Sequence, residues 1–152
     1  MGGYFDRPEE TEKVLKLHKD GKLWMHSGDL GHMDRDGFLF IDGRIKRMLI
    51  DHMGFKTFAP QVEQVLSQCS CVEKCCVVGA HDTDYGVGQI AVAYSIVKTD
   101  VKKAIAEMQL ACKSSLPAHS VPAKFIVVNT LPYTSAGKVD YRALERMAAE
   151  DK

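Results

Sequence analysis

The segment Gln89–Val97 constrains the fold more than any other, because its side chains alternate in size as well as in direction. Successive residues of a strand point to opposite faces, so large apolar residues would cover one face while Ala91, Ala93 and Ser95 cover the other. Small side chains let a helix pack closely, so the pattern predicts a strand with a helix on that face. A second apolar run, Lys74–Ala80, predicts another strand before it.

The rest of the second half predicts helices interleaved with strands. Pro60 suits the first position of a helix, and apolar residues follow it at helical spacing. We expect a second helix from near Asp100, a third strand over Lys124–Leu131, a loop to Lys138 and a last helix from about Asp140. The apolar residues assigned to the last two helices are Val101, Ile105, Met108 and Cys112, then Leu144 and Met147. A small, mostly antiparallel sheet flanked by helices is an α+β fold.

The first part of the chain is dominated by turns. Asp-Gly pairs between apolar runs indicate hairpins, because glycine adopts the positive φ that a tight hairpin turn requires. We therefore expect Leu30–Met33 to pair with Phe38–Ile41. A short helix is expected after Pro8 and through Leu17, and Met48–Ile50 begins another strand.

The charge balance argues against two classes of partner. The 152 residues contain 20 Lys and Arg against 20 Asp and Glu, whereas binding to nucleic acid or to a membrane surface needs an excess of basic residues. No run approaches the roughly 18 apolar residues that span a bilayer, and the N-terminus has no apolar signal segment. We expect no nucleic-acid partner and no membrane span.

The five cysteines predict a reducing compartment, most simply the cytoplasm. Their number is odd, and four of them crowd between residues 69 and 76, which does not resemble a secreted disulfide framework. The run lacks the paired C-x-x-C knuckles of a zinc site, so no metal site is expected.

Four short runs match the letters of known motifs but lack their context. Gly86–Ala91 leads into a strand rather than the helix that a dinucleotide-binding fingerprint requires. Asp34–Gly37 lacks the further ligands of a calcium loop, and His26–Asp29 are too close in sequence to form a catalytic relay. Gly137-Lys138 lacks the flanking residues of a P-loop.

What remains is a set of short pieces in a fixed order. They are Ser27-Gly28-Asp29-Leu30, Asp36-Gly37-Phe38, Gly43-Arg44-Ile45-Lys46, Gly54-Phe55-Lys56 with Pro60–Glu63, Val77-Val78-Gly79, and Leu131–Asp140. Their order and spacing resembles the C-terminal third of the adenylate-forming, or AMP-binding, enzymes: acyl-CoA synthetases, peptide-synthetase adenylation domains and luciferases. The resemblance covers essentially the whole chain.

The resemblance implies a reaction, its cofactors and its substrates. These enzymes join a carboxylic acid to AMP, release pyrophosphate and usually transfer the acyl group to a thiol. It implies ATP with Mg²⁺ and CoA in the full-length enzyme, a small-molecule carboxylic acid as substrate, and none of these bound tightly by this chain alone. It also implies a large N-terminal AMP-binding domain in the same polypeptide.

The resemblance also implies three site residues on the nucleotide side. Asp29 would accept hydrogen bonds from the ribose hydroxyls, and Arg44 would hold the ribose or phosphate side with its rigid donor fork. Lys138 would be the catalytic residue, because an ammonium there would neutralise the α-phosphate and substrate carboxylate oxygens during adenylation.

A hinge and a thiol-binding segment complete the expected site. Lys46 stands at the family's hinge, so residues 1–45 would be a β-hairpin remnant of the N-terminal domain and residues 46–152 a mobile C-terminal domain. One orientation would bring Lys138 to the reaction, and the other would present Gly54 and Phe55 to CoA. Lys56 would meet the nucleotide phosphates in one of the two states.

Within the superfamily, the sequence favours an acyl-CoA synthetase. The segments Arg47–Ile50 and Gly54–Pro60 are similar to fatty-acyl and aryl-CoA ligases, and the Gln-Val-Lys-Ile-Arg-Gly run of peptide synthetases is absent. We expect the chain to be the C-terminal fragment of a longer enzyme and to be inactive alone. Two alternatives stay open: a non-catalytic nucleotide-binding or partner-subunit module, and an adenylation domain that acts on a carrier protein.

Overall fold

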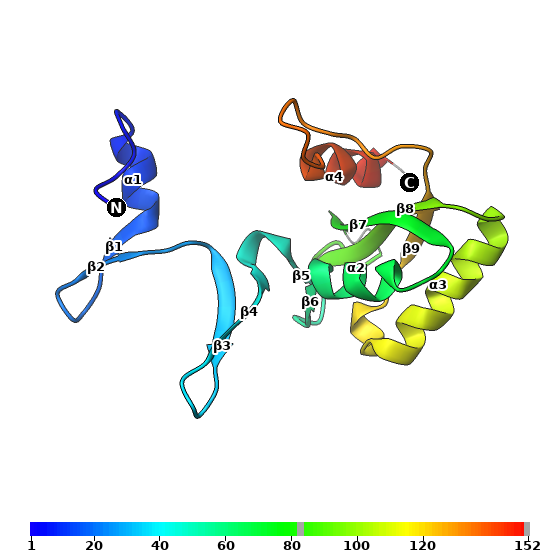
Figure 1. The fold of residues 1–152 in the computed structure, drawn as a ribbon, viewed down its shortest axis with the longest axis horizontal. Coiled ribbons are helices and arrows are strands. Elements are labelled where there is room, and N and C mark those ends of the chain that lie inside the picture. The colour runs from blue at the N-terminus through cyan, green and yellow to red at the C-terminus, as the bar shows by residue number, and fades with distance from the viewer. Residues whose placement is uncertain (82–83, 151–152) are drawn as a thin grey trace. The chain divides into compact units, whose positions relative to one another are not determined.

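The chain divides into two compact units, Met1–Lys46 (unit 1) and Arg47–Lys152 (unit 2). The structure is a computed structural model that describes residues 1–81 and 84–150; residues 151 and 152 of the expected C-terminal domain lie outside this range. Each unit is described by itself below, with the labels of Figure 1.

Unit 1 consists of one short helix and two hairpins. Helix α1 (Pro8–Val14) precedes β1 (Leu15–Leu17) and β2 (Leu23–Met25), and β3 (Asp29–Met33) pairs antiparallel with β4 (Leu39–Arg44). The β3–β4 hairpin confirms the pairing expected from the Asp-Gly turn. None of residues 1–46, all within the described range, is buried.

The helix expected to continue through Leu17 ends three residues earlier, so that expectation was wrong. The backbone becomes extended at Leu15, and Leu15–Leu17 pairs with Leu23–Met25. Gly21, with φ +73°, lies in the intervening turn. Strand pairing across this turn outweighs the local helical spacing, which spans only about one further turn of helix.

The core of unit 2 is a three-stranded sheet. Strand β8 (Gln89–Val97) lies between β7 (Val72–His81), which is antiparallel to it, and β9 (Lys124–Val127), which is parallel. Strand β9 is shorter than the expected Lys124–Leu131, because Val127 already pairs with Ser95 and β8 ends two residues later. The partner strand therefore runs out before Leu131.

Helices cover both faces of this sheet, as Figure 1 shows. Helices α2 (Ala59–Ser67) and α3 (Val101–Ser115) pack on the face that carries Ala91 and Ala93, which confirms the expectation from the small side chains. Helix α4 (Tyr141–Glu150) packs on the opposite face, against Val92 and Tyr94. Each described helix falls short of the length and apolarity needed to cross a bilayer.

The buried stripe of α3 differs from the expected one at its start. Ala104, Met108 and Cys112 are fully buried and Ile105 is half-buried, whereas Val101 is 46% exposed. Val101 is the first residue of the helix, directly after the Asp100 cap, so its side chain lies before the turns that pack on the core.

A small hairpin precedes the first long helix of unit 2. The one-turn helix η1 (Ile45–Arg47) leads into β5 (Met48–Ile50), which pairs antiparallel with β6 (Lys56–Phe58). Thr57 Oγ1 of β6 donates to His119 O at 3.3 Å, in the one-turn helix η2 (Ala118–Ser120). Leu49 is buried in the core with α2, so the hairpin is fixed to the unit on one side.

Candidate functional site

Lys138 lies at the end of a tight turn rather than in an open loop. Tyr133 and Val139 form an antiparallel bridge, Thr134 N donates to Lys138 O at 2.7 Å, and Gly137 N donates to Thr134 O at 2.9 Å. Gly137 has φ +72°, a conformation that glycine adopts without the steric cost other residues incur. Four residues thus form a compact turn that projects Lys138.

The Lys138 side chain is free to reach a ligand. Lys138 is exposed, and its ammonium forms no hydrogen bond or ion pair with any residue in the described part of the chain. A cation held on a short turn, but not neutralised by its own protein, remains available to an anionic substrate.

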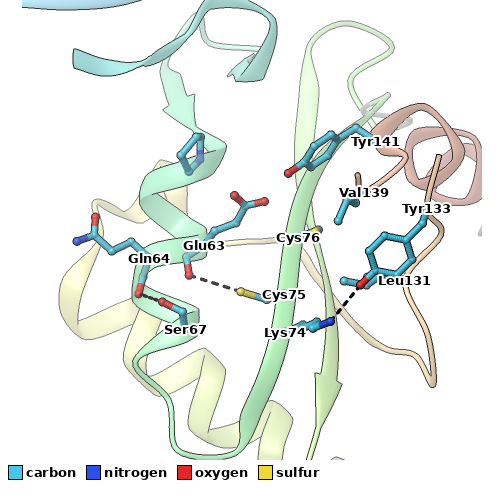
Figure 2. A pocket seen from close by; sticks show the side chains of 11 residues that line it. Glu63, Gln64, Ser67, Lys74, Cys75, Cys76, Leu131, Tyr133, Val139 and Tyr141 are labelled. Atoms are coloured by element: carbon cyan, nitrogen blue, oxygen red, sulfur yellow. Dashed lines mark hydrogen bonds between the residues drawn. The ribbon is translucent and has the colours of Figure 1, made fainter. Parts of the chain in front are cut away.

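The base of this turn borders a hollow of about 520 Å³ between α2, β7 and residues 131–141. Figure 2 shows Lys74 of β7 donating to the Tyr133 hydroxyl, at 3.3 Å, and the Glu63 carboxylate of α2 pointing toward the Tyr141 hydroxyl of α4. Cys75 and Cys76 also line the hollow. The hollow is therefore bounded by the segment that carries Lys138.

A cluster centred on Arg47 includes two residues that line this hollow, Glu63 and Tyr141. Arg47 Nη2 lies 2.6 Å from Glu63 Oε1 and donates to Val77 O at 3.1 Å, while Nη1 donates to the Tyr141 hydroxyl at 3.1 Å. The guanidinium carbon is 4.1 Å from the centre of the Tyr141 ring. Burial opposes the charge, but the hydrogen bond and negative charge of Glu63 outweigh it and raise the pKa of Arg47.

The sequence reasoning did not assign this cluster. Glu63 and Tyr141 lie 16 and 94 residues from Arg47, and no spacing rule links residues so far apart. One chemical signal in the sequence could have indicated the cluster. Arg47 directly precedes the apolar strand Met48–Ile50, which makes partial burial of its charge expected, and a partly buried charge needs a partner.

Gly54, Phe55 and Lys56 lie together at the tip of the β5–β6 hairpin. Gly54 has φ +84°, and a Cβ placed there would meet no atom within 4 Å, so the turn conformation rather than crowding requires glycine. The Asp51 carboxylate accepts from Phe55 N at 2.9 Å, and the Phe55 ring stacks on His119 with centres 4.9 Å apart. Lys56 is exposed.

The turn that carries Lys138 and the β5–β6 hairpin that carries Gly54, Phe55 and Lys56 pack in different clusters of unit 2. Leu131 and Val139, on either side of the turn that carries Lys138, pack in the cluster of α4, whereas Leu49 of the β5–β6 hairpin packs in the cluster of α2 and α3. The structure therefore does not bring Lys138 together with Gly54, Phe55 and Lys56.

Asp29 and Arg44 are brought together within unit 1. They are directly opposite residues of β3 and β4, and Arg44 Nε lies 3.0 Å from Asp29 Oδ1. The arginine side chain is 72% exposed and the aspartate 32%, so both retain access to a ligand. Lys46 lies in η1, is exposed, and is the last residue of unit 1.

The described residues do not form a resident metal site. Within residues 1–81 and 84–150, no three His, Cys, Asp or Glu side chains gather in a way that would hold a metal ion. All five cysteines are free thiols.

The element order of unit 2 and its sheet with helices on both faces define the class of protein: it is the α+β C-terminal domain of the adenylate-forming fold. The chain belongs to the family of AMP-binding enzyme C-terminal domains, and the model of this family matches residues 61–138.

Its curated relatives are CoA ligases. The chain is 37% identical over 148 residues to the medium/long-chain-fatty-acid–CoA ligase FadD8 of Mycobacterium tuberculosis, covering 94% of this chain and 25% of that protein. It is 38% identical over 147 residues to the putative acyl–CoA ligase YdaB of Bacillus subtilis, covering 96% of this chain and 27% of that protein. The chain thus spans about a quarter of the length of these relatives.

Solved structures show the same relationship. The O-succinylbenzoate coenzyme A synthetase of Bacillus subtilis, in complex with AMP, shares 30% identity with a TM-score of 0.78, over 95% of this chain and 28% of that chain. ATP-bound MatB from Rhodopseudomonas palustris shares 27% identity with a TM-score of 0.73, over 95% and 27% of the two chains.

Proposed function

We propose that this chain is the C-terminal part of an ATP-dependent acyl-CoA synthetase, which activates a fatty acid as acyl-AMP and transfers the acyl group to CoA. Support for the acyl class comes from relatives named as acyl-CoA ligases, and support for a fatty acid from the one named for medium and long chains. The observation that carries the proposal is Lys138, an exposed cation on a tight turn that forms no ion pair with residues 1–81 or 84–150. The free cysteines support a reducing compartment such as the cytoplasm.

Lys138 would act in the adenylation step. A substrate carboxylate oxygen attacks the α-phosphorus of ATP, and the bond from that phosphorus to the pyrophosphate oxygen breaks. The two reacting groups are both anionic and repel each other. The Lys138 ammonium would offset this repulsion and stabilise the charge on the α-phosphate oxygens.

Asp29 and Arg44 would hold the nucleotide beside this reaction. A carboxylate is an acceptor only, so it takes both hydroxyls of a ribose. The Arg44 fork, already oriented by Asp29 at 3.0 Å, would contact the ribose or phosphate side. Mg²⁺ would accompany ATP, and no step proposed for this chain depends on a resident metal.

The two sides of unit 2 support two working orientations. The segment that carries Lys138 packs with α4 and the β5–β6 hairpin packs with α2 and α3, so only one of them would face a given surface of the N-terminal domain at a time. Residues 46–152 would turn about Lys46, first placing Lys138 for adenylation and then Gly54 and Phe55 for CoA. Lys56 would contact phosphates in one of these states. Residues 1–45 would remain with the N-terminal domain.

One alternative is a module without catalytic activity, which binds nucleotide or a partner subunit. An adenylation domain that loads a carrier protein is a second alternative. We favour the enzyme because the chain keeps both the exposed lysine and the Asp29–Arg44 pair. Alone, the chain would lack the N-terminal domain and be inactive, so it should not catalyse pyrophosphate exchange.

The test is Lys138→Ala in the full-length protein, with each half-reaction measured separately. We expect ATP–pyrophosphate exchange to fall by roughly 10²–10³-fold, the loss seen when one electrostatic stabiliser of a transition state is removed. Thioester formation from preformed acyl-AMP should change little, because the ammonium is then directed away from the reaction.

The matched control is Lys113→Ala, which removes an exposed lysine from the last turn of α3. It should leave both half-reactions unchanged. An equal loss in the two half-reactions of Lys138→Ala would contradict the two-orientation proposal, and no loss in either would contradict the catalytic role.

A further inference from the structure

Arg47 joins the proposed pivot to the rest of unit 2. It directly follows Lys46 and is the first residue of the unit. Its guanidinium bonds to α2 through Glu63, to β7 through Val77 and to α4 through Tyr141. The backbone that leaves the pivot is therefore attached to three elements through a single side chain.

One of these three attachments leads to Lys138. Asp140 N donates to Pro132 O at 2.9 Å, and Tyr133 pairs with Val139, so the two strands of the Lys138 turn are closed at their base. Tyr141 directly follows Asp140. Arg47 therefore contacts the residue that follows the base of the Lys138 turn.

The contact is shielded and geometrically specific. The side chains of Arg47 and Glu63 are 20% and 18% exposed, so water screens their attraction only in part. A planar guanidinium bonds a carboxylate, a carbonyl and a hydroxyl at once while stacking on the ring, as Arg47 does here. A lysine ammonium cannot reproduce this set of contacts.

We propose that Arg47 is a positioning residue for adenylation: through Tyr141 it fixes the Lys138 turn relative to the pivot, so that rotation about Lys46 carries the ammonium to one defined place. This inference rests on the proposed function of Lys138. Without the attachment, the turn would move against the pivot and the ammonium would arrive with a spread of positions.

The fold has a second attachment that does not depend on Arg47. Glu63 Oε1 also accepts from Val77 N at 2.8 Å, so α2 stays bonded to β7 when the guanidinium is removed. Tyr141 also packs with Cys76 of β7, so α4 keeps its apolar packing on the sheet, whereas Arg47 supplies the hydrogen bond that joins Tyr141 to the residue after the pivot. Its substitution should therefore loosen the Lys138 turn more than it destabilises the unit.

The experiment measures both half-reactions of Arg47→Lys in the full-length protein. We expect ATP–pyrophosphate exchange to fall roughly tenfold, since displacements of about 1 Å have large effects on positioned groups. Thioester formation from preformed acyl-AMP should stay within twofold of the unsubstituted protein. Tyr141→Phe, which removes the hydroxyl and keeps the ring, should give a smaller loss in the same half-reaction. Arg142→Gln, at the exposed neighbouring residue, is the control without effect.

The decisive measurement is the double variant Arg47→Lys with Lys138→Ala. If Arg47 acts through Lys138, its substitution costs nothing further once the ammonium is gone. The positioning role would be overturned in favour of a structural one by either of two results. In one, the losses of the two single variants multiply in the double variant; in the other, Arg47→Lys lowers both half-reactions equally and also lowers the melting temperature.

The outcomes separate this inference from the proposed function. If Lys138→Ala leaves adenylation intact, the proposed function fails and this inference fails with it. If Lys138→Ala is selective while Arg47→Lys and Tyr141→Phe leave adenylation unchanged, only the role of Arg47 is wrong. Should Arg47→Lys not fold, Tyr141→Phe alone decides the question.

Discussion

At the scale of single residues, the cysteines show how burial changes a reactive group. Burial, with a contribution from the Glu63 charge, raises the pKa of Cys75 to about 12 and that of Cys76 to about 11. Burial likewise raises the pKa of Cys112 to about 11. These thiols remain protonated at neutral pH and behave as small apolar side chains.

This shift predicts a loss of stability at alkaline pH. An unfolded thiol releases its proton near pH 8.5, whereas folded Cys112 keeps its proton to about pH 11. The unfolded state therefore binds fewer protons in this range, and the free energy of unfolding falls as the pH rises from about 8.5 through 11. We expect the urea midpoint to fall less steeply with pH in Cys112→Ala than in the unsubstituted chain.

The control for this measurement is Ser114→Ala, an exposed position on the same helix. Its midpoint should follow the pH in parallel with the unsubstituted chain. Parallel curves for Cys112→Ala as well would show that its thiol does not contribute to the alkaline transition.

At the scale of elements, α4 shows that tertiary packing selects among apolar positions of a predicted helix. The helix was expected from about Asp140 with Leu144 and Met147 as its apolar residues. It begins at Tyr141, and the Asp140 carboxylate accepts from Ala143 N at 3.0 Å. Leu144 and Ala148 are buried, whereas Met147 is 40% exposed. Leu144 and Ala148, which are four residues apart, therefore face the sheet, and Met147 does not.

This difference predicts unequal costs for two substitutions in one helix. Leu144→Ala removes a fully buried side chain and should lower the free energy of unfolding by about 2–5 kcal/mol. Met147→Ala, at a position that is 40% exposed, should change it by no more than about 0.5 kcal/mol. Urea unfolding of both variants measures the difference, and equal costs would mean that α4 does not pack as described.

At the scale of the whole molecule, the two units differ in whether they contain a buried apolar core. Both buried clusters belong to unit 2. Unit 1 leaves large apolar side chains exposed on its hairpins, among them Trp24, Phe38 and Phe40. We expect this exposed apolar surface to contact another protein surface, which the N-terminal domain implied by the family would supply.

This contrast predicts the course of limited proteolysis. Trypsin should cut first within residues 1–46, where no described residue is buried, and should leave a resistant fragment that contains α2, α3, α4 and the sheet. Electrophoresis with mass spectrometry of the fragments gives the cleavage sites. First cuts within 59–115 would contradict the assignment of the stable core to unit 2.

The sequence by itself determined the local features of this protein. Alternation along Gln89–Val97 indicated its two faces, glycines marked the turns, and the spacing after Pro60 indicated α2, because these patterns record how neighbouring residues are exposed. It also placed Asp29, Arg44 and Lys138 in motif order, and their roles stay predictions. Tertiary structure alone decided where β9 ends, that Leu15–Leu17 is a strand, and that Arg47 meets Glu63 and Tyr141. The end of β9 and the Arg47 cluster depend on partners distant along the chain, and local periodicity carries no information about which distant segment comes alongside. Leu15–Leu17 depends on strand pairing across the Gly21 turn, which outweighs its helical spacing.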